Sequence, residues 1–80
     1  MPYIDEHAKR ELRAGRRART VGELTYQIQR DLKQYLKNHD HSYSTMAEIL
    51  GALEGAKADF VERVLKPYEQ RKCDQNGDVW

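Results

Sequence analysis

Residues 20–38 read TVGELTYQIQRDLKQYLKN, and this stretch decides the fold. Its apolar side chains recur at spacings of four, four, three and one residues: Leu24, Ile28, Leu32, Tyr35 and Leu36. This spacing places them on one face of an α-helix, with polar and charged side chains opposite. Thr20 and Glu23 have the spacing of a capping box, which satisfies free backbone N–H groups where a helix begins. The stretch therefore predicts an amphipathic helix over 20–38.

A second, longer helix is predicted over 45–66. Thr45 and Glu48 repeat the capping-box spacing. The apolar side chains that follow recur at helical spacing: Met46, Ile49, Leu50, Leu53, Phe60, Val61, Val64 and Leu65. Pro67 predicts a boundary of this helix, because a proline disfavours the α conformation in the residue before it, and the alternative is that 68–72 continue as a kinked last turn. Since a short polar loop joins 20–38 to 45–66, we expect the two helices to form an antiparallel hairpin.

The two ends of the chain flank this hairpin. Residues 5–17 predict a short basic helix whose inner side carries Ile4, Ala8 and Leu12. Residues 73–80 contain the turn-forming sequence DQNGD and predict an irregular tail. The predicted fold class is all-α: one small domain made of an antiparallel helical hairpin, a short basic N-terminal helix and an irregular C-terminal tail.

Length and composition exclude several classes of protein. A chain of 80 residues is one small domain, too short for a large catalytic unit. No apolar run approaches the ~18 residues of a membrane-spanning helix, and the opening MPYIDEHAKR lacks the apolar core of a signal peptide. The single cysteine, Cys73, has no partner for an internal disulfide and cannot build a zinc site alone.

Positive charge is concentrated near the N-terminus, although the net charge of the chain is only +1. Residues 9–19 hold six cations against one anion, and five of the cations are arginines: Arg10, Arg13, Arg16, Arg17 and Arg19. A guanidinium suits the paired oxygens of phosphate or carboxylate. The cluster predicts an anion-binding segment for a nucleotide, nucleic acid or acidic protein surface, and the alternative is a solvated helix face. A dedicated nucleic-acid domain normally has a more basic overall balance.

Aromatic and small residues suggest contacts with partners. Tyr26 lies off the apolar face of 20–38 and is a candidate for an interface or base-stacking contact, as is Trp80 at the end of the tail. The alternative is that the tyrosines border a small core. Small residues one turn apart mark the predicted long helix: Gly51, Ala52, Gly55 and Ala56. Each glycine costs about 1 kcal/mol against alanine in a helix interior, so we expect a compensating close contact. That contact lies within the hairpin or with a second copy, and we favour a homo-oligomer because the single-chain core is small.

The sequence contains no recognisable catalytic motif. His39 and His41 flank Asp40 in a polar loop, but no second cluster completes a metal site. Cys73 stands beside Lys72 without a resolving cysteine. We therefore expect a protein that is not an enzyme and needs neither a metal nor a cofactor.

Several segments resemble a family of small proteins from phages and prophages. The matching segments are MPYI at 1–4, GELTY at 22–26, YSTMAE at 43–48, GALE at 51–54, PYEQRK at 67–72 and NGDVW at 76–80. The arginine-rich stretch 9–19 departs from the family pattern. The resemblance implies a virus-encoded accessory protein in the cytoplasm of a host bacterium, where Cys73 stays reduced. It implies no particular activity.

Three functions remain open from the sequence. We favour a non-enzymatic phage accessory protein that counters host defence by sequestering an anionic nucleotide signal or by blocking a host protein. The second hypothesis is a small nucleic-acid-binding regulator that uses the arginine-rich segment. The third is a structural or assembly factor, for which self-association suffices.

Overall fold

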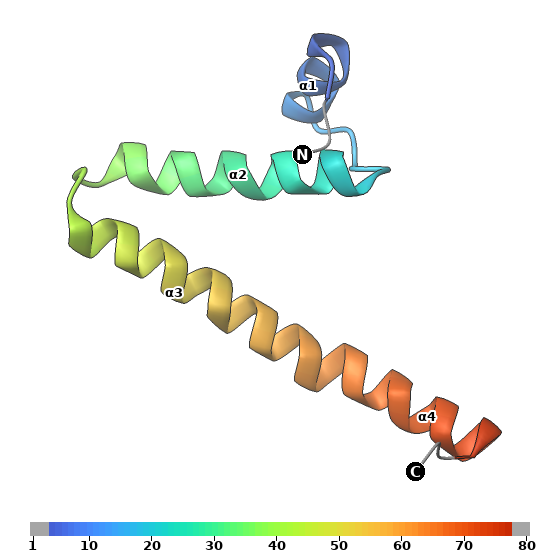
Figure 1. Ribbon diagram of the computed structural model, residues 1–80. Coiled ribbons are helices and arrows are strands. Elements are labelled where there is room, and N and C mark those ends of the chain that lie inside the picture. Colours follow the sequence, from blue (N-terminus) through green and yellow to red (C-terminus); the bar gives the residue numbers. More distant parts are fainter. Residues whose placement is uncertain (1–3, 78–80) are drawn as a thin grey trace. The chain divides into compact units, whose positions relative to one another are not determined.

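The computed structural model describes residues 4–77, and most of that range is helical (Figure 1). The elements follow one another in the order α1 Glu6–Arg13, α2 Val21–Asn38, α3 Tyr43–Phe60, the π-helical turn η1 Val61–Leu65 and α4 Lys66–Asn76. Residues 4–77 contain no β-strand, so the all-α prediction is confirmed. The chain divides into two compact units, Met1–Thr45 and Met46–Trp80. The antiparallel packing of a hairpin stays a prediction.

Helix α1 is shorter than the predicted 5–17 at its C-terminal end. It begins after Asp5, whose carboxylate accepts a hydrogen bond from the Ala8 N–H at 2.8 Å. It ends at Arg13 because Gly15 adopts a φ of +109°, which L side chains rarely adopt. The N–H of Gly15 then bonds to the carbonyl of Leu12, and the N–H of Arg16 bonds to the carbonyl of Glu11. This pair of bonds is a Schellman motif, which satisfies the last carbonyls of the helix and turns the chain away.

Helix α2 has the predicted bounds, with Thr20 as its N-cap. The Thr20 hydroxyl accepts from the Glu23 N–H at 3.1 Å, as the capping box predicts. The other half of the box differs, because the Glu23 carboxylate accepts from the Arg19 N–H at 2.9 Å, outside the helix. At the far end, the His39 ring stacks on Tyr35 with a centroid distance of 4.0 Å.

The core of the first unit forms where α1 packs against α2. Leu12 is its buried apolar side chain, and Ile4 and Ala8 are half-buried beside it, as predicted. On α2 the predicted apolar face stays largely open, with Leu24 52% and Ile28 41% exposed. One small cluster of side chains therefore holds α1 in place.

Helix α3 begins two residues before the predicted start of 45. The Ser42 hydroxyl accepts from the Thr45 N–H at 3.1 Å, so Ser42 supplies the cap, and the capping box predicted from Thr45 and Glu48 is wrong. Thr45 is only 3% exposed, and its hydroxyl instead donates to the Asp40 carboxylate at 2.7 Å. Hydrogen bonds from Thr45 and then Ser42 lower the pKa of Asp40.

The long helix does not end at 66, which corrects the predicted bound, and residues 68–72 are helical as the alternative had it. The π turn η1 precedes this proline, and within it the Lys66 N–H bonds to the carbonyl of Val61, five residues back. Proline lacks an N–H and its ring crowds the carbonyl four residues earlier, so a wider turn accommodates it. Pro67 then lies in the first turn of α4, a position where proline is tolerated.

The irregular tail predicted for 73–80 is also corrected in part. Cys73–Asn76 is the last turn of α4, and the helix ends at Gly77, whose φ is +82° and whose N–H bonds to the Cys73 carbonyl at 2.8 Å. Although the sequence after Cys73 has turn propensity, helical hydrogen bonds continue as far as Gly77. Trp80 lies outside the described residues.

Candidate anion-binding site

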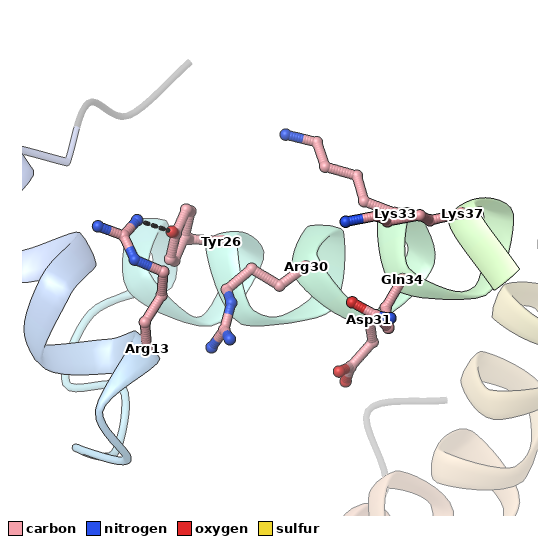
Figure 2. Close-up of a pocket in the computed structure, with 7 residues that line it drawn as sticks. All are labelled: Arg13, Tyr26, Arg30, Asp31, Lys33, Gln34 and Lys37. Atoms are coloured by element: carbon pink, nitrogen blue, oxygen red, sulfur yellow. Dashed lines mark hydrogen bonds between the residues drawn. The ribbon is translucent and has the colours of Figure 1, made fainter.

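A basic pocket of about 360 Å³ lies on α2 beside the end of α1 (Figure 2). We call it the α2 pocket, and seven residues line it: Arg13, Tyr26, Arg30, Asp31, Lys33, Gln34 and Lys37. Four of these are cations and one is a carboxylate, which leaves a formal charge of +3. Its volume is at the lower end of the ~300–1,000 Å³ typical of small-molecule sites.

The helical repeat of α2 brings four of these side chains onto one face. Tyr26, Arg30, Lys33 and Lys37 follow one another at spacings of four, three and four residues. This is the spacing of one helix face, and it lies opposite the apolar face that contains Ile28. The same amphipathic pattern that defines the helix therefore also aligns its cations.

Arg13 joins this face from α1. Its Nη1 donates to the Tyr26 hydroxyl at 2.8 Å (Figure 2). The Lys9 ammonium lies 5.8 Å from the centroid of the Tyr26 ring, within the range of a cation–π contact. The sequence singled out Arg13 and Tyr26 separately, and the structure brings them together at one end of the α2 pocket.

The remaining polar side chains of the pocket are largely uncommitted. Arg30 reaches the Leu12 carbonyl at 3.5 Å, a long contact that leaves most of its donors available. Within residues 4–77, no hydrogen bond or ion pair engages the side chains of Asp31, Lys33 or Lys37, and all three are exposed. Arg13 has a carboxylate partner, since its Nη2 lies 3.9 Å from Glu6, so the positive charge of the pocket without an ion-pair partner in residues 4–77 is that of the α2 cations.

Arg16 has a different role from its neighbours. Its guanidinium donates to both carboxylate oxygens of Glu23 at 3.0 Å, and its Nε donates to Glu11 at 3.1 Å. The side chains of Arg16 and Glu23 are only 16% and 14% exposed. The hydrogen bonds from Arg16 and from the Arg19 N–H lower the pKa of Glu23 to about 2, and the pairing raises the pKa of Arg16. Arg16 therefore joins the segment after α1 to the first turn of α2, and its donors are already used.

The other predicted site residues lie away from the α2 pocket. Arg10, Arg17 and Arg19 are exposed and do not line it. The four small residues of α3 are also exposed: Gly51, Ala52, Gly55 and Ala56. A Cβ built at either glycine meets nothing within 4 Å, so no packing within the described chain requires a glycine there.

Sequence reasoning missed Arg30, Lys33 and Lys37 as site residues, although their pattern was readable. Counting from Tyr26 along one helix face reaches each of them in turn. The arginines of 9–19 are a stronger signal by residue type alone, because six cations stand there within eleven positions. Their convergence with Arg13 required the turn at Gly15, which brings the end of α1 back to α2.

Other kinds of site are not apparent in the described part of the chain. In residues 4–77 no group of three or more His, Cys, Asp or Glu side chains is placed to hold a metal ion. Cys73 is exposed beside a shallow hollow of about 280 Å³ on α4, without another cysteine in the sequence. None of the helices in this range is both long and apolar enough to cross a membrane.

Comparison with known proteins identifies a family but not an activity. A search of the curated proteins found no match, and a search of the solved structures found none either. Residues 1–79 match a family described as DUF6899, a domain of unknown function. Because the match covers nearly the whole sequence, the chain belongs to the DUF6899 family.

Proposed function

We propose that this chain is a non-enzymatic binding protein whose α2 pocket holds a small anionic ligand of the nucleotide class. The observation that carries the proposal is that four cations and one aromatic ring line a single pocket with a formal charge of +3. Phosphate groups suit the arginines and lysines, and a planar base suits an aromatic ring.

The energetics of α2 favour this proposal over a solvated face. Lys33 and Lys37 are one turn apart, where like charges destabilise an isolated helix. Lys37 lies in the last turn, so the negative end of the helix dipole compensates its charge in part. That compensation falls off within one turn and does not extend to Arg30. A bound anion would relieve the repulsion among all four cations.

The biological setting of this proposal rests on the resemblance to phage proteins. We propose a phage accessory protein in the host bacterial cytoplasm that counters defence by sequestering a nucleotide signal. Blocking a host protein is the corresponding role if the cations of the α2 pocket contact an acidic protein surface instead.

A nucleic-acid-binding regulator is the second candidate, and one observation favours it. The cations of α2 form an exposed row along the helix, and Arg10, Arg17 and Arg19 are exposed in the same unit. A row of this kind can follow a phosphate backbone. Binding through five or six phosphates would weaken steeply with salt, with a log–log slope of roughly −5, whereas a mononucleotide would not require a polymer.

The proposal is tested by calorimetric titration of the full chain with adenosine diphosphate and with a short DNA duplex. We expect saturable nucleotide binding that is weakened about tenfold or more by the double change Lys33→Gln and Lys37→Gln. The matched control is Lys57→Gln with Arg71→Gln, which removes the same charge from exposed positions of α3 and α4. Equal loss in both double variants would reduce the effect to net charge, and binding of the duplex alone would favour the second candidate.

We also propose that the second unit acts through self-association. None of residues 46–77 is buried, and Leu50, Phe60 and Val64 are 50% or more exposed. A helix with such a surface is marginal in water unless it packs against another. A second copy presents the same apolar residues and the same glycines, so in a two-fold symmetric dimer the same surface of each copy would be in contact. An assembly factor would need only this property.

A further inference from the structure

We infer that the ligand of the α2 pocket carries hydroxyl groups as well as phosphate, and that Asp31 distinguishes a ribonucleotide from a bare phosphate or a nucleotide without sugar hydroxyls. This inference rests on the proposed function and specifies its ligand. It begins from the presence of one carboxylate in a pocket that otherwise selects anions.

Asp31 is not needed to neutralise its neighbours within the described chain. No ion pair involves the Asp31 carboxylate among residues 4–77, because the helix positions that face it, three and four residues away, carry no cation. Asp59 and Glu62 differ from Asp31, since each has a cation one turn away and pairs with it. Asp31 is therefore available to a ligand.

The chemistry of a carboxylate restricts which ligand groups it can contact. At neutral pH the Asp31 side chain only accepts hydrogen bonds, so it repels phosphate and attracts hydroxyl or amine donors. A site for inorganic phosphate would be weakened by this residue. A ligand that combines phosphate with neighbouring hydroxyls would use both signs of charge in the pocket, and a carboxylate commonly binds the hydroxyls of a nucleotide ribose.

The positions of the side chains allow this division. Figure 2 shows the Asp31 carboxylate and the Arg30 guanidinium on the same side of α2. The Lys33 side chain extends to the opposite side of the helix, and the Lys37 side chain does not point towards Asp31. Gln34 lies beside Asp31 and offers both a donor and an acceptor, although its amide also contacts Asn38 at 3.3 Å. The pocket thus has a cationic part for phosphate and a smaller polar part for hydroxyls.

Three probes and one substitution test the inference on the full chain. The probes are adenosine diphosphate, 2′,3′-dideoxyadenosine diphosphate and pyrophosphate, titrated by calorimetry at one salt concentration. We expect the ribonucleotide to bind at least roughly tenfold more tightly than the dideoxy analogue, as one charge-assisted hydrogen bond would provide. Asp31→Asn should weaken the ribonucleotide and tighten pyrophosphate, because it removes both the strong acceptor and the repulsion.

Opposite signs for the two ligands are the decisive result, since a merely structural role for Asp31 would weaken both. The charge-matched control, Glu54→Gln on the exposed surface of α3, should tighten both ligands slightly and leave the preference for the ribonucleotide intact. Equal binding of the ribonucleotide and its dideoxy analogue would overturn this inference while leaving anion binding in place. Failure of every probe to bind at millimolar concentration would overturn the proposed function as well.

Discussion

Arg16 and Glu23 form a bidentate ion pair, in which both N–O distances between the guanidinium and the carboxylate are 3.0 Å. The pair connects the segment after α1 to the first turn of α2, and Glu11 adds a third hydrogen bond from α1 itself. Geometry of this kind is among the stronger charge pairings in proteins. Arg16 thus differs from the other arginines of residues 9–19, which are exposed.

Replacing Arg16 or its neighbour Arg17 by glutamine should cause different losses of stability. We expect Arg16→Gln to lower the thermal midpoint by about 5 °C, because Glu23 and Glu11 lose their donors. Arg17→Gln removes the same charge from an exposed side chain and should shift the midpoint by about 1 °C or less. Thermal unfolding followed by circular dichroism measures both, and equal shifts would contradict the structural role of Arg16.

Acid should destabilise the first unit through Glu23. Its pKa is lowered to about 2 from an ordinary value of 4.5, so its ionised form is favoured by folding. The stabilising contribution is complete above pH 4.5 and is lost as the pH falls towards 2. The lowered pKa of Asp40 acts in the same direction. Melting curves between pH 7 and pH 2 should show this loss, and Glu23→Gln should reduce it; an unchanged pH profile would contradict the assignment.

Replacing Gly15 tests the turn that ends α1. We expect Gly15→Ala to destabilise the chain by about 1–2 kcal/mol, since its φ of +109° is unfavourable for a residue with a Cβ. Sterics around the new methyl are not the cause, because it would meet no atom within 4 Å. Chemical denaturation measures the loss, and Gly55→Ala on α3 is the matched control, with no positive φ to strain. A neutral Gly15→Ala would show that the turn does not limit stability.

Substituting Gly55 with a large residue tests self-association. We expect Gly55→Leu to reduce the molar mass measured by light scattering to that of one chain, because the added side chain blocks close approach of a second helix. Gly55→Ala should have a smaller effect on the mass. A wild-type chain that is already monomeric, or a Gly55→Leu variant with the original mass, would remove the close-packing argument.

Removing lysines from the α2 pocket and removing its carboxylate should change the salt dependence of nucleotide affinity in different ways. Nucleotide affinity should fall as salt rises in the wild type, and it should fall less steeply in the variant that carries Lys33→Gln and Lys37→Gln. Asp31→Asn should retain the wild-type slope or increase it. Titrations at three salt concentrations separate these outcomes, and identical slopes in all three proteins would contradict a phosphate contact at the lysines.

Much of the fold was predictable because local signals dominate it. The bounds of α2 follow from its apolar period and from Thr20, a cap that acts within its own turn. The errors arose where two local rules competed. Pro67 signals a helix end by its steric effect, yet a wider turn absorbs that effect. Turn-forming residues after Cys73 favour a loop, yet helical bonding continues to Asn76.

The candidate site was predictable only in part, for a physical reason. Arg13 and Tyr26 were recognisable from residue type, since an arginine in a basic cluster and a tyrosine off the apolar face both suggest contacts. That Arg16 is used internally depends on the path of the chain between the helices, which brings it back to Glu23. The proposed role of Asp31 depends on its place in the lining of the α2 pocket, which the helical period of the sequence does not reveal.

The π turn at Val61–Leu65 has a consequence for any helix that lies along α3 and α4. A π turn accommodates about one residue more than an α turn, so the residues after it are displaced by about 100° around the helix axis. Tyr68, which an unbroken α-helix would place in line with Leu50, is therefore turned away from that line. A straight partner helix that packs along Leu50 and Leu53 of α3 would therefore face a different side of α4. The π turn would limit the length over which two copies can pack with the same residues in contact.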